Sequence, residues 1–556
     1  QMDSPQVFRP EEAGALLPVY SLTQGLSNKM VSRQVTEALN RVEQLPDPLE
    51  GSGLPQQYGL LSYSQALHAV HFPPDWQAIE TGRNRMVFDE LLCLSLCFAR
   101  MREGRHRLHV PPMRMQPLTE YYRALPYELT GAQQRAIAEA MSDMCSGTPM
   151  NRLVQGDVGS GKTMVAAACA WFAARNGWQS ALMAPTEILA RQHYATLAPL
   201  FARFGLPCAL LTGSTPAKER RAVLAGLDSG EIALCISAHA LLTEDVRYHR
   251  LGLVITDEQH RFGVAQRSAL GQKAENPHML VLSATPIPRT LALIIYGDLD
   301  VSIINELPPG RQRVDTFAVD ERYRARLNGF IRKQVAEGHQ VFIVCPLVGD
   351  GDDLPDERKA VTAYARTLQE ETFPDLRIAV LHGKMKVREK ESVMAAFAAG
   401  ETDILVSTTV VEVGVDVPNA TLMVVENAER FGLSQLHQLR GRVGRGRAKS
   451  YCVLVAQGGG EETKRRLKAL TDTNDGFKIA EEDLKLRGPG DFFGQRQHGL
   501  PMLQIADLNC DMLLLEEAQS AARELLASDD QLTAPEHRKL RKRIDELFEM
   551  NAEGLN

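Results

Sequence analysis

Two stretches in the first hundred residues repeat apolar side chains at helical spacing. They cover residues 27–43 and 83–102, and proline-containing breakers at 45–48 and 72–74 lie between them. Residues 1–20 carry no periodic signal. This pattern predicts a helical region over residues 21–125, in which no chemical motif stands out.

From residue 126 onward, short apolar runs alternate with longer helical runs. Such alternation predicts a parallel, doubly wound sheet with helices between the strands. A proline-rich linker at 307–310 separates two blocks of this kind. The predicted strands contain residues 153–154, 181–185, 208–211, 233–236, 253–256 and 279–282 in the first block, and 340–344, 378–381, 404–406 and 422–425 in the second.

Composition narrows the class of protein. The chain has 556 residues, 44% of them apolar, which is enough for several packed domains. No run of eighteen apolar residues and no secretory signal occurs, and the nine cysteines form no C-x-x-C pair. These features predict a reduced, cytoplasmic protein without structural zinc. The net charge of −7 argues mildly against a nucleic-acid binder, yet basic clusters occur at 440–449, 464–468 and 538–543. For the last cluster a solvated helix face is the favoured interpretation.

One glycine-rich segment fits G-x-x-x-x-G-K-[ST], the pattern of a loop that cradles phosphates. An apolar run precedes it and helix formers follow, so that backbone N–H groups and a helix N-terminus meet at one point. We expect Lys162 to reach the outer phosphates of a nucleotide and Thr163 to ligate Mg²⁺. The whole segment consists of Gly156, Asp157, Val158, Gly159, Ser160, Gly161, Lys162 and Thr163.

Polar residues follow the predicted strands of the first block, where a doubly wound sheet carries its functional loops. Asp257 is expected to hold the Mg²⁺ shell, and Glu258 to orient and deprotonate an attacking water. Gln133, after a predicted helix N-cap at Thr130, could read adenine with its amide, although a surface glutamine is the commoner case. The other residues at these strand ends include Thr186, Thr212, His239, Ser283 and Thr285, and for the last two an ordinary turn is equally plausible.

The second block has no phosphate loop of its own. Its chemistry lies in Thr409, in Gly414 and Asp416, and in a segment that runs from Gln435 to Arg445. We expect its arginines, three residues apart on one helix face, to reach across a cleft and neutralise a γ-phosphate. A nucleic-acid patch or a solvated helix is the alternative. Two sheets that share one nucleotide would form a clamp that opens and closes with hydrolysis.

Taken together, these motifs resemble the superfamily-two helicases and, within them, the RecG family of bacterial double-strand DNA translocases. The resemblance spans about residues 126–501 and includes the phosphate loop and the segments 183–190, 257–264, 283–290, 306–311 and 438–445. It implies two tandem RecA-like domains at 126–308 and 309–460, preceded by a possible barrel remnant (1–20) and a helical linker (21–125) and followed by a translocation region (461–556).

The resemblance also implies a function: ATP-dependent translocation on duplex DNA, with Mg²⁺, that remodels stalled forks and Holliday junctions in recombination and repair. It assigns roles in the ATP site to Lys162, Asp257, Glu258, Arg442, Arg445, Gly414 and Asp416. Coupling roles fall on His260, Ser283, Thr285 and Gln438. DNA contacts fall on Thr186, Thr212, His239, Thr409, Arg466, Arg487 and Gln497.

Relatives of this kind carry an N-terminal oligonucleotide-binding barrel that splits strands at a junction, and we expect this chain to contain at most its last strand, in residues 1–20. We therefore expect ATP hydrolysis and duplex engagement, while efficient fork unwinding depends on that barrel. By the resemblance the protein acts as a monomer in a bacterial cytoplasm, with single-strand DNA-binding protein as a partner.

Three alternatives remain. The translocase module of a transcription-repair coupling factor shares the segment after Asp257, but its phosphate loop usually has Phe where Ser160 stands. A DNA-binding clamp that uses nucleotide only as a switch is the second, and an RNA helicase is the third. The restart helicase PriA would need a zinc-binding cysteine cluster.

Overall fold

The computed structural model describes residues 16–552 except 24, 42–45, 107, 239, 258–272, 275, 285–298, 309–310, 347–356, 409–416, 447, 459, 488–502 and 508–509. The chain forms two compact units. Unit 1 comprises Gln1–Glu103, Arg289–Asp298 and Gly488–Asn556, and unit 2 comprises Gly104–Pro288 and Leu299–Arg487. The residues after 487 thus belong to a different compact unit from residues 461–487, although the sequence predicts 461–556 as one region. The bounds of the five predicted domains stay predictions.

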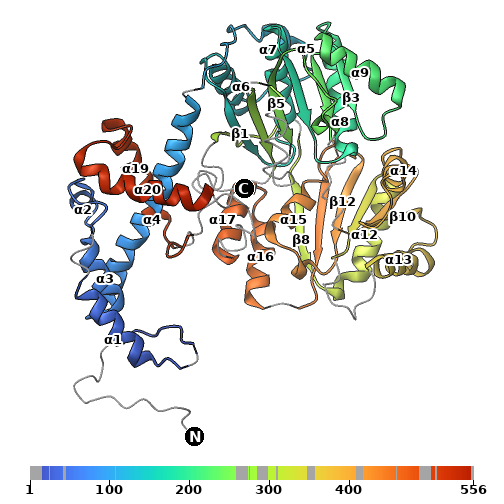
Figure 1. Cartoon of the computed structure of the whole chain (residues 1–556). Coiled ribbons are helices and arrows are strands. Elements are labelled where there is room, and N and C mark those ends of the chain that lie inside the picture. The colour runs from blue at the N-terminus through green and yellow to red at the C-terminus, as the bar shows by residue number, and fades with distance from the viewer. Residues whose placement is uncertain are drawn as a thin grey trace. The chain divides into compact units, whose positions relative to one another are not determined.

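Unit 2 contains two parallel sheets, as the apolar runs predict (Figure 1). The first sheet has the strand order β3-β4-β2-β5-β6-β1-β7. Its central strands are almost entirely buried because helices cover both faces, and this explains their continuous apolar runs. The elements are α5 (Thr119–Ala124), α6 (Gly131–Met144), β1 (Asn151–Gly156), α7 (Lys162–Arg175), β2 (Gln179–Met183), α8 (Glu187–Ala202), β3 (Cys208–Leu211), α9 (Ala217–Ser229), β4 (Leu234–Ser237), β5 (Leu251–Asp257), β6 (His278–Ser283) and β7 (Asp300–Ile304).

The second sheet has the order β10-β11-β9-β12-β13-β8, also parallel throughout. Two apolar clusters, one on each face, hold its helices in place. The elements are β8 (Val314–Val319), α12 (Arg324–Ala336), β9 (Gln340–Val344), α13 (Glu357–Thr367), β10 (Ile378–Leu381), α14 (Val387–Ala398), β11 (Ile404–Ser407), β12 (Ala420–Val425), α15 (Leu433–Arg440), β13 (Ser450–Val455), α16 (Glu461–Asp472) and α17 (Gly476–Arg487).

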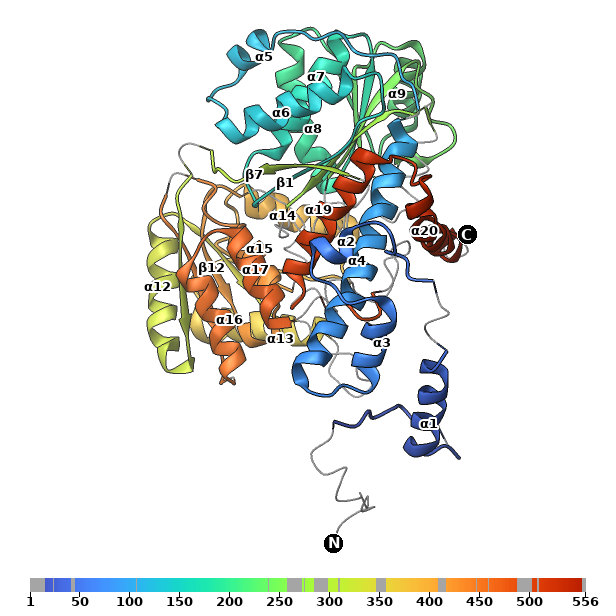
Figure 2. The same ribbon diagram turned by 90° about the vertical axis from the view of Figure 1, so that its left-hand side faces the viewer.

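The helices α15, α16 and α17 pack on one another, and both ribbon views show them side by side on the second sheet (Figure 2). Asp483 of α17 accepts hydrogen bonds from the backbone N–H (3.3 Å) and the hydroxyl (2.6 Å) of Ser434 at the start of α15. The residues after the second sheet therefore form a hairpin, α16–α17, that is attached directly to α15.

A buried histidine makes the first sheet sensitive to acid. His278, at the start of β6, accepts the backbone N–H of Met150 through Nδ1 at 3.0 Å. Burial lowers the pKa of its imidazole to about 4, because the charged form is poorly solvated there. Its pKa in the unfolded chain is higher, so below pH 6.5 the unfolded state binds an extra proton and the free energy of unfolding falls as the pH falls.

We expect the titration of His278 to lower the free energy of unfolding by about 2 kcal/mol when the pH falls from 7 to 5. His278→Asn keeps an acceptor for the Met150 N–H and removes the titrating ring. Urea denaturation of both proteins at the two pH values should show a smaller pH dependence in the variant by that amount. An equal pH dependence in both would contradict the assignment.

Unit 1 is helical, as predicted, and Ser27 caps its first helix by accepting the backbone N–H of Met30. The long helix α4 extends beyond the predicted range 83–102 at both ends. Cys93 and Cys97 lie in its buried face, and all nine cysteines are unpaired. The elements are α1 (Asn28–Leu39), α2 (Leu54–Gln57), α3 (Tyr63–His71), α4 (Trp76–His106), α19 (Met512–Ser528) and α20 (Arg538–Ala552).

Arg85 of α4 is a fully buried cation that fastens the loop before α2 to this helix. Its guanidinium pairs with Asp47 (2.5 Å) and Asp89 (2.9 Å) and donates to the Leu61 carbonyl (2.5 Å). Burial favours the neutral acid at Asp89 and raises the pKa of this carboxyl to about 6, even with Arg85 beside it.

We expect Arg85→Met to destabilise unit 1 by about 3–5 kcal/mol, because it leaves two carboxylates without their buried partner. Arg41→Met is the matched control, since Arg41 pairs with Glu37 at 3.6 Å on an exposed surface and such pairs contribute little. Thermal unfolding of both variants measures the difference. Equal melting temperatures would show that the buried pairs add no stability.

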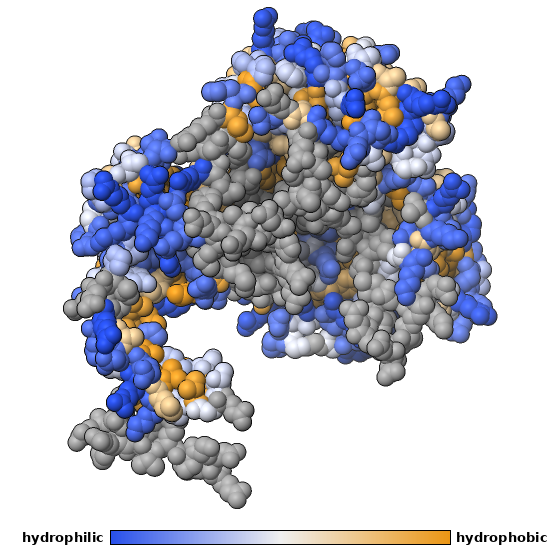
Figure 3. Space-filling model, viewed as in Figure 1, coloured by the Kyte–Doolittle hydropathy of each residue, from blue (hydrophilic) through white to orange (hydrophobic). Residues whose placement is uncertain are grey.

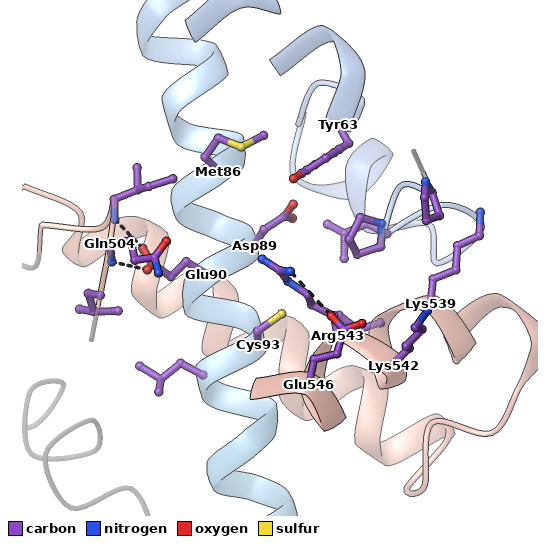
Figure 4. A pocket seen from close by; sticks show the side chains of 17 residues that line it. Tyr63, Met86, Asp89, Glu90, Cys93, Gln504, Lys539, Lys542, Arg543 and Glu546 are labelled. Carbon is purple, nitrogen blue, oxygen red and sulfur yellow. Dashed lines mark hydrogen bonds and ion pairs between the residues drawn. The ribbon is translucent and has the colours of Figure 1, made fainter. Parts of the chain in front are cut away.

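A cavity of about 370 Å³ lies within unit 1 beside α4 (Figure 4). Glu90, on one wall, accepts the backbone N–H groups of Gln504, Ile505 (3.0 Å) and Ala506 (2.8 Å). Asp89 of α4 and Arg543 of α20 point toward one another across it. The cavity thus lies where three segments distant in sequence meet.

The basic cluster of α20 is partly paired with carboxylates, for example Arg543 with Glu546 (3.8 Å), as expected of a solvated helix face.

Hydrophilic residues make up most of the coloured surface in Figure 3. Among the helices that the structure describes, none is both long and apolar enough to cross a bilayer.

Candidate functional site

The predicted phosphate loop connects β1 to α7 as expected. Gly159 and Gly161 adopt positive φ angles of 74° and 83°, a conformation that side chains disfavour. Gly156 has no room for a methyl group, because a Cβ there would lie 2.6 Å from the Ser160 hydroxyl and 2.9 Å from the Ile304 carbonyl. The pattern's glycines are therefore required by backbone geometry.

Lys162 is the first residue of α7, and its ammonium group folds over the loop. It donates to the carbonyls of Gly156 and Asp157, both at 2.8 Å. Thr163 follows it in the first turn of the helix. A cation and a helix N-terminus thus lie at the same point, and both favour the binding of a phosphate group.

Two side chains from outside the loop pack against its backbone. The Gln133 amide donates to the Ser160 carbonyl (2.8 Å) and accepts the N–H of Thr130 (2.8 Å), which completes the predicted N-cap of α6. Arg311, in the linker between the sheets, lies so close to Gly159 that a Cβ there would be 1.3 Å from its guanidinium. The reading of adenine by Gln133 stays a prediction. In the sequence, Arg311 ends the segment 306–311, which belongs to the family resemblance.

Asp257 ends β5, the strand predicted to carry the metal carboxylate. Its Oδ2 lies 2.8 Å from Nε2 of His193, a buried residue of α8. Sequence reasoning missed His193, because nothing in its local pattern distinguishes it from a core histidine. The carboxylate of Asp257 and the hydroxyl of Thr163 are oxygen donors of the kind that Mg²⁺ prefers, with water completing its shell. Within the described residues no cluster of three or more His, Cys, Asp or Glu could hold a metal.

The second domain reaches the phosphate loop through α15. His437 Nε2 lies 2.6 Å from Oδ1 of Asp157, and Gly441 is so close to Val158 that a Cβ there would be 2.8 Å from the valine Cβ. Burial favours the neutral form of Asp157, but the hydrogen bonds from His437 and from the Val158 N–H, together with nearby positive charge, outweigh this and the pKa of the carboxyl is lowered.

The predicted placement of the finger arginines on one helix face is wrong. The helix α15 ends at Arg440, and Gly441 is its C-cap, so Arg442 and Arg445 lie in the turns that follow. Gly444, with φ of 78°, turns the chain again. Arg442 is buried, and Arg445 donates through Nε to the Gly441 carbonyl at 3.3 Å. Gly441 ends the helix before Arg442, and Gly444 turns the chain before Arg445, although the spacing of the two arginines fits a helix.

The other predicted residues occupy the ends of strands and helices. Thr186 caps α8, and Thr212 follows β3 with its hydroxyl 3.1 Å from that of Ser214. Ser283 is buried at the end of β6. Gln438 lies on α15, Arg487 ends α17, and Arg466 of α16 donates to the carbonyls of Glu429 (3.0 Å) and Phe431 (3.4 Å). Their functional roles stay predictions. Eight predicted residues lie outside the described residues: His239, Glu258, His260, Thr285, Thr409, Gly414, Asp416 and Gln497.

Comparison with known proteins supports this architecture. Residues 130–294 match the DEAD/DEAH box helicase family, and residues 324–447 match the helicase conserved C-terminal domain. Residues 473–554 match "ATP-dependent DNA helicase RecG, domain 3, C-terminal". These matches cover most strands of both sheets and much of the region that follows them.

Curated relatives named ATP-dependent DNA helicase RecG match nearly the whole chain. The Synechocystis protein is 45% identical over 97% of this chain and 64% of its own length. The Bacillus subtilis protein is 44% identical over 98% of this chain and 80% of its own length. The chain therefore spans about two thirds to four fifths of these relatives.

A solved structure described as RecG bound to a three-way DNA junction superposes with a TM-score of 0.72 at 43% identity. It covers 92% of this chain and 67% of that one. A DUF1998 helicase, MrfA, bound to DNA is similar in fold alone, with a TM-score of 0.50 and 17% identity. The phosphate loop, the two parallel sheets and the identity over almost the full chain agree, and the chain belongs to the RecG family of ATP-dependent DNA helicases.

Proposed function

We propose that this chain is an ATP-driven motor that moves along duplex DNA and remodels branched DNA. One observation supports this most: the turn that carries Arg442 and Arg445 follows a helix that contacts the phosphate loop of the other domain through His437 and Gly441. The turn that carries these arginines thus begins next to the phosphate cradle of the other domain. This is the arrangement that a hydrolytic clamp needs.

Within this proposal each residue has one task. Lys162 holds the outer phosphates, and Glu258 orients the attacking water. Thr163 and Asp257 would hold Mg²⁺ through its water shell, and the ion when bound neutralises phosphate charge. Arg442 and Arg445 stabilise charge that grows on the γ-phosphate in the transition state. Gly414 and Asp416 complete the nucleotide contacts, and Gln133 reads the base.

Branched DNA is the proposed substrate because the related structure was solved with a three-way DNA junction. We propose that duplex DNA contacts Thr186, Thr212, His239 and Thr409, and that Arg466, Arg487 and Gln497 serve the translocation hairpin. We propose that the chain acts as a monomer, with single-strand DNA-binding protein as a partner.

ATPase assays with forked, linear duplex and single-stranded DNA test the proposal. We expect both duplex-containing DNAs to stimulate hydrolysis, and Lys162→Ala to lower it strongly. Hydrolysis that no DNA stimulates, or that duplex RNA stimulates as well as duplex DNA, would contradict the proposal. Nucleotide binding without turnover would instead favour a nucleotide-switched clamp.

We expect His193→Ala to lower kcat about 10–100-fold and to raise the Mg²⁺ concentration needed for half-maximal activity, because a group that orients a metal-binding carboxylate has effects of this size. His193→Asn or His193→Gln, which can still donate to Asp257, should recover part of the loss. Magnesium titrations of ATPase activity measure both quantities. An unchanged magnesium dependence in His193→Ala would show that His193 does not orient the carboxylate.

A further inference from the structure

A continuous chain of hydrogen bonds crosses unit 2 from the phosphate loop to the α16–α17 hairpin. It starts at Asp157, whose backbone carbonyl accepts from Lys162 (2.8 Å) and whose Oδ1 accepts from the Val158 N–H (2.7 Å) and faces His437 (2.6 Å). The His437 side chain is only 5% exposed. Asp157 is thus tied to the phosphate-binding lysine on one side and to the second domain on the other.

The next link fixes the position of the proton on His437. Its Nδ1 lies 2.8 Å from Nη2 of Arg440, one turn further along α15. A guanidinium can only donate, so Nδ1 must accept. The single ring proton therefore sits on Nε2 and is donated to Asp157. His437 joins a cation on one side to an anion on the other and is held in one tautomer.

Arg440 carries the connection into the hairpin. Its Nη1 donates to the carbonyls of Leu470 (2.9 Å) in the last turn of α16 and of Thr473 (2.8 Å) just after it. The last carbonyls of a helix have no partner within the helix, so this buried cation caps α16 where the chain turns into α17. Arg440 thus holds the hairpin at its turn.

We propose that His437 is a positioning residue that couples nucleotide binding at the phosphate loop to the α16–α17 hairpin, by way of Asp157 and Arg440. The inference rests on the proposed function of the loop as the ATP site. None of the roles assigned to the loop, to the finger arginines or to Arg466 requires His437.

A bound phosphate would act on this relay at its first link. Its charge competes with the Asp157 carbonyl for the Lys162 ammonium and repels the Asp157 carboxylate. A shift of Asp157 moves the acceptor of the His437 proton, and the rigid helix α15 carries the movement to Arg440 and the hairpin. A ligand shifts an equilibrium only through differences of this kind between two states.

Two substitutions cut the relay at different links. His437→Asn can place an oxygen near the former Nδ1, where it accepts from Arg440 but does not reach Asp157. His437→Gln can place an amide N–H near the former Nε2, where it donates to Asp157 but offers Arg440 nothing. His437→Ala removes both links. His109, an exposed histidine, is the matched control, changed to Asn and to Gln.

The test is a linkage measurement that does not need turnover. The affinity of a fluorescent linear duplex is measured with and without a β,γ-imido analogue of ATP, and the affinity of the analogue with and without the duplex. Both ratios equal the same coupling factor, whatever the individual affinities are. A merely structural role for His437 would weaken the affinities and leave this factor unchanged.

We expect His437→Asn, His437→Gln and His437→Ala each to bring the coupling factor at least fivefold closer to one, and the His109 variants to leave it unchanged. Circular dichroism melts confirm that each variant is folded, and if His437→Ala is not, the Asn and Gln variants decide. A coupling factor that stays within twofold of the parent in both would overturn the relay, as would a parent chain without coupling. If the parent couples the two ligands but hydrolyses no ATP, the proposed motor function fails and the relay stands.

Discussion

Arg445→Ala is expected to lower kcat for DNA-stimulated ATP hydrolysis by about 10³-fold or more, with a much smaller change in nucleotide affinity. An arginine that reaches a γ-phosphate acts on charge that develops in the transition state, and such residues contribute about 10³–10⁵ in rate. Arg445 is suited to this role because it follows Gly441, which packs against Val158 of the phosphate loop. Steady-state kinetics together with equilibrium nucleotide binding separate the two effects.

Two comparisons sharpen this experiment. Arg445→Lys keeps the charge without the planar fork of donors and should recover only a small part of the rate. Arg388→Ala, at an exposed position on α14, should leave kcat unchanged. An Arg445→Ala variant with normal kcat and weaker DNA binding would instead identify this segment as a nucleic-acid patch, the alternative that the sequence leaves open.

Lys162→Ala is expected to lower kcat by about 10²–10³-fold and to weaken nucleotide binding as well. In the proposed mechanism the ammonium is one of the fixed donors at the phosphates, and the loss of a single such donor has this size of effect on rate. The substitution also leaves the carbonyls of Gly156 and Asp157 without their 2.8 Å partner, so the loop itself loses support. Lys162→Met, which keeps the side-chain volume, should lose as much activity as Lys162→Ala.

The control for this position is Lys218→Ala on α9, an exposed lysine of the same domain. ATPase assays and nucleotide titrations compare Lys162→Ala, Lys162→Met and Lys218→Ala with the parent protein. If Lys162→Ala hydrolyses ATP at a rate within threefold of the parent, the phosphate loop takes no part in the mechanism.

Much of the fold could be predicted because its signals are local. A strand buried on both faces is mainly apolar, and so the runs at 181–183 and 253–256 identify β2 and β5. Thr130 caps α6 by accepting an N–H three residues away. All residues of the phosphate loop, from Gly156 to Thr163, are consecutive in the sequence. Its match to a nucleotide site therefore needs no knowledge of the rest of the chain.

The partners of those residues could not be predicted, because they arrive from distant parts of the chain. Asp257 meets His193 across 64 positions, and Asp157 meets His437 across 280. Nothing in the local sequence distinguishes His193 and His437 among the fourteen histidines of the chain. Spacing also suggested one helix for Arg442 and Arg445, whereas the glycines around them end it. The sequence by itself determined two parallel sheets and a phosphate loop. Only the tertiary structure decided which side chains hold them, since a hydrogen bond depends on distance in space and not on separation along the chain.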